Sequence, residues 1–285
     1  PNQRMDLLGN TQQRLNLRYR GRFDWGALDA RTYRETVDHF MDFGADKRYW
    51  YGPASGGTTA VDGAPCAPPG PTCAGGMPMH TESATTGVAV RADIALGDQD
   101  LLRLGGEYQG YRLDDWWPPS GGGMWPNTFW NVNDGRRDRA ALFAEWEAPL
   151  NARWTTLLGA RYERVTTDAG PVQAYNDAVA PATTLVPAFN GRDRKRTDDN
   201  WDFTALVRTT DDATRDIELG IARKLRSPNL YERYTWYSRG MEMLMINWVG
   251  DGNGYIGDMD LEPEVAHTVS ATFDWHAPDR SWQFR

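Results

Sequence analysis

The sequence predicts an all-β fold: a section of an antiparallel transmembrane β-barrel, about ten strands long, with short periplasmic turns and long extracellular loops. Three observations predict it. Segments along the chain alternate between apolar and polar residues, as strands do when lipid touches one face and water the other. Aromatic residues are abundant (13 Trp, 12 Tyr and 9 Phe), yet the mean hydropathy is only -0.66. Short and long connections also alternate along the chain.

The alternation begins with the strand predicted over residues 12–23. Its polar side is dominated by arginine, which indicates a wet lumen. The apolar set is Leu15, Leu17, Tyr19, Gly21 and Phe23, and the polar set is Arg14, Asn16, Arg18, Arg20 and Arg22. After the tight turn Asp24-Trp25-Gly26, a second strand is expected over 28–43, with a register shift near Thr32 through a β-bulge.

The remaining strands follow from the same pattern. They are predicted at 84–96, 101–115, 136–148, 153–166, 200–210, 214–227 and 264–276, with a further strand beginning after 277–279. The strand at 264–276 is clear, because Val265, His267, Val269, Ala271, Phe273 and Trp275 share one face.

The lengths of the connections distinguish the periplasmic end of each predicted strand from its extracellular end. Short turns are expected at 24–26, 97–100, 149–151, 211–213 and 277–279, and long loops at 44–83, 116–135, 167–199 and 228–263. A soluble β-sandwich has no reason to collect its long loops at one end, whereas outer-membrane barrels do. A soluble sandwich or propeller is the alternative, and the lack of a fixed repeat disfavours the propeller.

Composition excludes several classes of protein. No run approaches the roughly 18 apolar residues of a membrane-spanning helix. The net charge of -8 argues against a nucleic-acid partner and is compatible with attracting cations. The sequence shows no signal peptide and starts at Pro1, so we expect a fragment of a longer protein.

Two segments resemble the TonB-dependent outer-membrane receptors. They are SPNLYERY (Ser227 to Tyr234) and GDMDLEPEVAHTVSATFDWH (Gly257 to His276), in which Asp258-Met259 replaces the Asn-Pro pair of the family. Three further segments are similar to the copper-receptor branch: NWVGDGNGY (Asn247 to Tyr255), LDDWWPPSGGGMWPNTFWNVNDGRRDR (Leu113 to Arg139) and MPMHTES (Met77 to Ser83).

The resemblance implies a barrel of about 22 strands in the bacterial outer membrane, filled by an N-terminal plug that contacts the TonB complex. Residues 1–285 would then be a partial barrel domain, without the plug and the remaining strands. The partners expected for the whole receptor are the TonB complex, copper, and the lipid and lipopolysaccharide of the outer membrane.

Copper, with Cu(I) favoured, would be the transported ligand rather than a resident cofactor, and soft thioether, thiolate and imidazole groups prefer it. The candidate metal ligands are Met77 and Met79, whose sulfurs point to one side of an extended chain, with His80 joining through a local bend. A second candidate set is Met241, Met243 and Met245, and Met124 stands alone. Packing of loop methionines against aromatic side chains is the alternative for each.

Cys66 and Cys73 lie close together in a Pro/Gly-rich segment. A loop disulfide is favoured for an exported protein. The alternative is a thiolate and thioether pair of Cys73 with Met77, and the two cannot hold together.

No residues suggest an enzyme. No Ser/His/Asp set or phosphate loop is present, and His39, His267 and His276 have no partners at ligand spacing. His267 is expected at the membrane interface. The acidic residues Asp114, Asp115, Asp198, Asp199, Asp211 and Asp212 are expected to solvate loops and turns.

The sequence therefore predicts a TonB-dependent copper receptor that captures copper through extracellular Met-rich loops for energised import. A receptor for a siderophore or another metal chelate is the alternative within the class. A non-transporting surface adhesin or soluble β-domain is the alternative from another class.

Overall fold

The computed structural model describes residues 6–42, 48–50, 60–62, 78–97, 99–119, 126–209, 214–237 and 255–284. Ten strands form one antiparallel sheet. They are β1 (Asp6–Phe23), β2 (Gly26–Asp42), β5 (Met79–Leu96), β6 (Asp100–Trp117), β7 (Phe129–Asn151), β8 (Trp154–Asp168), β9 (Arg196–Thr209), β10 (Arg215–Arg226), β11 (Glu264–His276) and β12 (Gln283–Phe284). In this sheet β2 pairs with β1 and β5, β5 pairs with β2 and β6, and every other strand pairs with its neighbours in the chain order. β3 (Arg48–Trp50) and β4 (Ala60–Asp62) form a separate two-stranded sheet.

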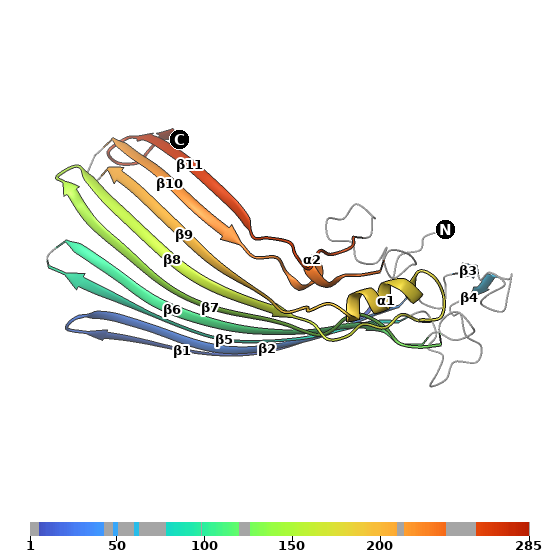
Figure 1. Ribbon diagram of the computed structural model, residues 1–285. Helices are drawn as coiled ribbons and strands as arrows, with labels where there is room; N and C mark the ends of the chain where they lie inside the picture. The colour runs from blue at the N-terminus through green and yellow to red at the C-terminus, as the bar shows by residue number, and fades with distance from the viewer. Residues whose placement is uncertain are drawn as a thin grey trace.

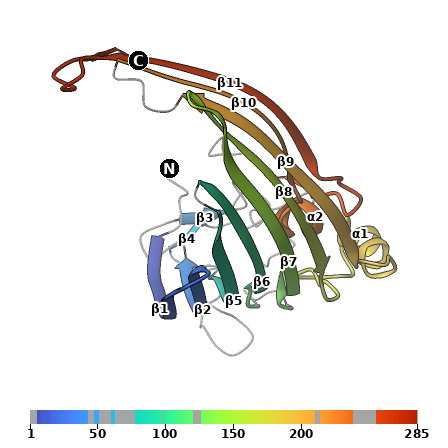
Figure 2. The ribbon, with the colours of Figure 1, turned by 90° about the vertical axis from the view of Figure 1, so that its left-hand side faces the viewer.

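The sheet is a curved wall with two different ends. The short turns lie at one end, and the helices α1 (Ala182–Asn190) and α2 (Leu230–Tyr234) lie at the other, as Figure 1 shows. The wall curves from β1 round to β11 (Figure 2). This arrangement confirms the predicted separation of short turns from long loops. Among the described residues, neither helix has the length and apolar character needed to cross a membrane.

One face of the sheet, called the apolar face here, carries large hydrophobic side chains that are exposed rather than packed in a core. Val269 is 85%, Leu15 75% and Leu142 67% exposed. The same face carries Leu17, Val88, Val90, Leu104, Leu158, Phe203, Leu219 and Ile221, all exposed. An exposed apolar surface of this extent indicates contact with lipid.

Aromatic side chains occur in two tiers on the apolar face. Near the turns, the rings of Phe23 and Trp25 stack with their centroids 5.2 Å apart. Farther toward the loops, the Trp201 ring lies 5.0 Å from the Tyr162 ring and 6.2 Å from the Phe203 ring. Two aromatic girdles bounding an apolar band are typical of outer-membrane barrels, because amphipathic rings favour the two water interfaces.

The strands are longer than the sequence predicts at their loop ends. β5 begins at Met79 rather than at 84, β7 at Phe129 rather than at 136, and β9 at Arg196 rather than at 200. β7 reaches 23 residues, whereas about 9–11 suffice to cross a bilayer. Beyond the membrane both faces of a strand are wet, so the apolar alternation that reveals it fades.

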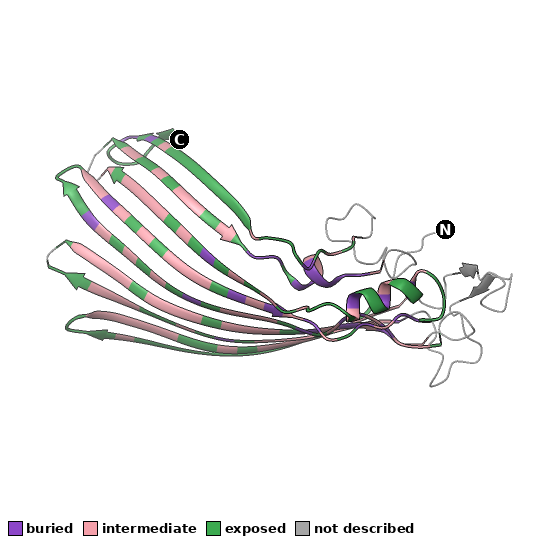
Figure 3. Cartoon of the chain, in the orientation of Figure 1, coloured by how far each residue is buried: buried purple, intermediate pink, exposed green. Residues whose placement is uncertain are grey.

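The predicted β-bulge was wrong. The register of β1 with β2 runs unbroken from Gly9–Phe40 to Phe23–Gly26, so there is no bulge near Thr32. The long connections predicted at 167–199 and 228–263 contain the short helices α1 and α2. Figure 3 shows that buried positions gather on α2 and at the loop ends of the strands.

Placing an arginine in the middle of the apolar face should destabilise the wall. Val90 is 43% exposed and pairs with Ala30 and Gly106, inside the apolar band. In the full-length receptor, we expect Val90→Arg to lower the free energy of unfolding in lipid by ~2–4 kcal/mol, because the guanidinium would meet hydrocarbon. Urea unfolding in bilayers measures this loss.

The matched control is Thr268→Arg on the opposite face of β11. There the arginine would enter water, so little change is expected. Equal losses in the two variants would contradict the assignment of the faces.

Candidate functional site at the loop end

The polar face, opposite the apolar one, is crossed by ion pairs between neighbouring strands. Glu107 on β6 accepts hydrogen bonds from Arg139 on β7, at 2.9 Å, and from Arg161 on β8. Arg103 pairs with Glu145 and with Glu147 across the β6–β7 ladder. These pairs link three strands side to side, as expected for a face that water reaches.

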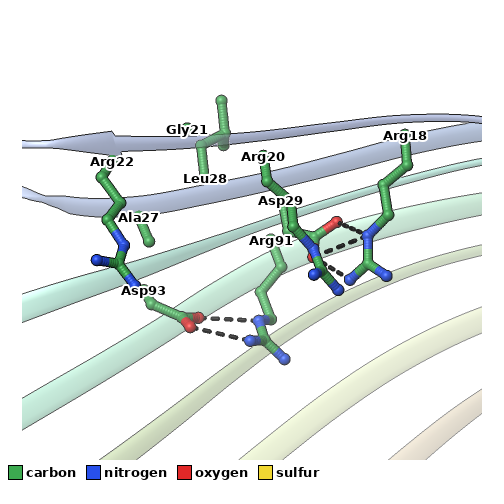
Figure 4. Close-up of a pocket in the computed structure, with 9 residues that line it drawn as sticks. All are labelled: Arg18, Arg20, Gly21, Arg22, Ala27, Leu28, Asp29, Arg91 and Asp93. Atoms are coloured by element: carbon green, nitrogen blue, oxygen red, sulfur yellow. Dashed lines mark hydrogen bonds and ion pairs between the residues drawn. The ribbon is translucent and has the colours of Figure 1, made fainter.

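The turn end of the polar face is basic. Arg18, Arg20, Arg22 and Arg91 surround Asp29 and Asp93 at a shallow cavity of about 350 Å³. Figure 4 shows the Arg18 guanidinium on Asp29 and the Arg91 guanidinium on Asp93. The four arginines outnumber the two aspartates, so this patch carries excess positive charge.

At the loop end, the polar face is covered by a hydrophobic core, the loop-end cluster. It consists of Leu113, Trp117, Phe129, Val132, Ala169, Val172, Ala174, Tyr175, Ala182, Val186, Phe189, Leu230, Tyr234, Trp236 and Met259. The Phe129 ring stacks on Trp236 at 5.4 Å and lies edge-on to Trp117 at 5.5 Å. α1 and α2 contribute from the loops, so the cluster fixes loop segments onto the wall.

The short helix α2 is positioned by polar contacts at its N-terminal end. Asn229 and Glu232 form a capping box, in which each side chain accepts a hydrogen bond from the other residue's backbone N–H. Arg226 donates to Glu232 and Glu264. The Arg226 hydrogen bond is the main reason why the pKa of Glu232 is lowered.

Arg233 on α2 is the buried centre of the loop-end site. Its side chain is 2% exposed and donates to the Asp198 carboxylate at 2.8 Å, to the Thr167 hydroxyl at 2.8 Å and to the Leu261 carbonyl at 2.9 Å. These bonds join β9, β8 and the segment before β11. Tyr234 adds hydrogen bonds to Thr167 and to the Arg194 carbonyl.

The expected role of several acidic residues was wrong. Asp115 is fully buried, and its carboxylate accepts from Asn131 at 2.7 Å and from Thr81 at 3.4 Å. Asp198 holds Arg233, and Asp199 accepts from Tyr162 and Arg164. Asp115 and Asp198 are structural because α2 and the strand ends bury them, whereas Asp199 is exposed, as expected, and pairs at the surface. Asp211 and Asp212 lie outside the described residues.

Of the predicted metal ligands, the structure describes Met79 and His80. They are consecutive residues of a regular strand and therefore face opposite sides, so no local bend brings His80 to Met79. His80 instead stacks on the Trp116 ring at 5.1 Å. Met79 is half-buried on the polar face and packs against the loop-end cluster.

Met41 is a residue that sequence reasoning did not select as a ligand. It lies directly opposite Met79 in the β2–β5 ladder, and His39 follows on the same face opposite Thr81. The connection between β2 and β5 is long, so their register could not be counted along the sequence. Met77, Met124, Met241, Met243, Met245, Cys66 and Cys73 lie outside the described residues.

Clusters of His, Cys, Asp or Glu do not add a metal site. In the described part of the chain, no group of three or more such residues could hold a metal ion. His267 lies exposed on the apolar face of β11, and His276 is buried at the end of β11.

The whole chain, residues 1–285, matches the family described as TonB dependent receptor-like, beta-barrel. The chain belongs to this family. Its barrels stand in the bacterial outer membrane, so the apolar face meets lipid, the turns are periplasmic and the loops are extracellular. No curated protein matches the sequence.

Solved structures share the fold. The copper transporter OprC aligns with a TM-score of 0.61 at 15% identity, over 96% of this chain and 37% of that chain. The FrpB iron transporter from Neisseria meningitidis aligns with a TM-score of 0.55 at 15% identity, over 94% of this chain and 35% of that chain. The siderophore receptor PiuA from Acinetobacter baumannii aligns with a TM-score of 0.52 at 12% identity, over 95% of this chain and 38% of that chain. The chain thus spans little more than a third of the length of these receptors.

Acid should loosen α2. The pKa of Glu232 is lowered in the folded protein, so its contribution to stability is present above the ordinary value of 4.5 and is lost as the pH falls through the folded value. We expect hydrogen-exchange protection of residues 230–234 to fall as the pH drops below the ordinary glutamate value of 4.5. Glu232→Gln should show a smaller fall, and Glu262→Gln in the same loop should behave like the wild type.

Removing the Arg233 guanidinium should release the loops. We expect Arg233→Met to cost ~3–5 kcal/mol of local stability, because Asp198 would keep a buried charge without its partner. Hydrogen exchange of α2 and of residues 257–261 measures the release. Adding Asp198→Asn should recover part of the loss, whereas the exposed Arg192→Met should have little effect. Unchanged protection in Arg233→Met would contradict this role.

Proposed function

We propose that this chain is the part of a receptor wall that captures copper at the extracellular end of a lumen, for import driven by the TonB complex. The observation that carries the proposal is the pair Met41 and Met79, directly opposite each other on the polar face. Directly opposed residues have their Cβ atoms about 4.5–5.5 Å apart, close enough for two flexible thioethers to meet one ion. Thioether sulfur prefers Cu(I) over harder cations.

The surroundings of this pair support capture from outside. It lies at the loop end, where Met79 contacts the loop-end cluster and Met77 precedes Met79 by two residues in the sequence. His39 adds an imidazole on the same face. Met241 and Met243, in the loop before β11, are proposed as a further capture set, with copper as cargo throughout.

Import needs parts of the receptor beyond this chain. In this proposal a plug closes the lumen, and the TonB complex moves the plug to release copper inward. The wall contributes the capture residues and a rigid frame, because the ion pairs on the polar face link its strands.

A metal chelate is the second candidate cargo, and two observations favour it. A cavity of about 150 Å³ beside α1 and α2 is lined by Phe189, Trp236 and the guanidinium-bearing Arg192 and Arg233. The basic patch at the turn end would also attract an anionic chelate and repel a free cation.

Loss of the paired thioethers should weaken copper binding. In the full-length receptor under reducing conditions, we expect Met41→Ser/Met79→Ser to lower Cu(I) affinity by about tenfold or more. Competition with a chromophoric Cu(I) chelator measures the affinity. Met77→Ser/Met79→Ser should show a loss of the same order if Met77 shares the ion.

The matched control is Met259→Leu, which removes a thioether from the loop-end cluster while preserving its packing. Its Cu(I) affinity should equal that of the wild type. Unaltered affinity in Met41→Ser/Met79→Ser would sink the copper proposal and favour the chelate receptor.

A further inference from the structure

The apolar face ends, toward the loops, in a belt of charged residues. Asp100 and Arg215 lie on that face beside the turns. Beyond the apolar band, the next charged side chain toward the loops is Arg112 on β6, Arg164 on β8 and Arg223 on β10. The belt adjoins the loop-side aromatic tier of Tyr162, Trp201 and Phe203: Arg164 lies on its loop side, and Arg223 lies beside Phe203. The belt therefore lies at the depth of lipid headgroups in the outer leaflet.

Most of the arginines in and just above the belt are neutralised by an acid on the same face. Arg112 donates to Asp138 at 2.8 Å, and Arg164 donates to Asp199 at 2.8 Å. Arg136, farther up β7, pairs with Asp134. Because their charge is already balanced by a carboxylate, these guanidinium groups are not expected to bind a further anion.

Arg223 differs from them. Within the described residues its hydrogen bond goes to the Trp201 carbonyl, at 2.6 Å, and no acidic side chain pairs with it. Its neighbours across the ladders are Phe203 on β9 and His267 on β11, and the rows beside it hold Ile221 and Val269. A cation surrounded by apolar and aromatic side chains at a membrane surface is costly without a counter-charge.

His267 supplies a second polar group at the same place. It is exposed and lies directly opposite Arg223 in the β10–β11 ladder, so the two side chains leave the same face about 4.5–5.5 Å apart at Cβ. Since one Arg223 nitrogen is held by the Trp201 carbonyl, the other guanidinium N–H groups and the imidazole can converge on one anion.

We propose that Arg223 and His267 form a binding site for a phosphate group of the lipopolysaccharide headgroup. A guanidinium fork matches phosphate geometry, and the bond strengthens at a partly dehydrated interface. Ile221 and Val269, on the membrane side of the pair, and Phe203 beside Arg223 offer an apolar surface for the acyl chains of the same lipid. Because the charged pair and the apolar surface adjoin, the site fits a lipid with a phosphorylated headgroup better than a free anion.

The test is lipid binding by the full-length receptor in detergent, measured by native mass spectrometry. The probes are lipid A with two phosphates and the same lipid with its phosphates removed. We expect Arg223→Gln to lower affinity for the phosphorylated lipid by about tenfold or more, and His267→Gln by less. Arg112→Gln, an arginine of the same belt already paired with Asp138, should bind like the wild type.

Arg223→Lys keeps the positive charge and should retain most of the binding, so it tests the site if Arg223→Gln fails to fold. Wild-type affinity in both Arg223→Gln and His267→Gln would overturn the proposal. Equal affinity of the wild type for the dephosphorylated lipid would overturn it as well. Displacement of the lipid by inorganic phosphate at similar concentration would show a free-anion site and overturn the lipid assignment.

Discussion

The structure depends on the constraint that backbone N–H and C=O groups facing hydrocarbon have no water to bond. Within the wall each inner strand satisfies them through ladders on both sides, as β6 does with β5 and β7. A strand also sends alternate side chains to opposite faces, so the same ladder separates lipid from water. This explains why Val269 and Leu142 are exposed while the buried core is confined to the loop end.

The loop end is stabilised by a different set of interactions. There the strands rise above the bilayer, and α1 and α2 fold back onto the polar face. Hydrophobic burial stabilises the loop-end cluster. Arg233 fixes the relative positions of its parts, because its guanidinium hydrogen-bonds to three separate segments. Close backbone approach completes the join: a Cβ on Gly257 would lie 2.7 Å from the Arg233 carbonyl carbon, so only glycine fits there. The loops near the capture residues are thus held by the wall.

Faces could be predicted from the sequence because they depend on local alternation. The pattern of 12–23 and of 264–276 places each residue on the face that the structure shows. The ends of the strands could not be predicted, because beyond the bilayer no lipid requires every second residue to be apolar. The capping-box spacing of Asn229 and Glu232 could have revealed α2, whereas Pro187 within α1 argues against a helix. The Met41 and Met79 pair depends on register across a long connection, which only the assembled sheet defines.

The distribution of charge on the polar face bears on where a cation could be captured. At the turn end, arginines of β1 and β5 exceed their aspartate partners, so a free cation would meet repulsion there. Across β6, β7 and β8 the charges are matched, as the two acids Glu107 and Glu163 with the two bases Arg139 and Arg161 show. Neutral thioethers avoid this problem, because sulfur donates electron density to a soft cation without adding charge. A wall with excess positive charge near the periplasm therefore favours metal capture at the loop end, where Met41 and Met79 lie.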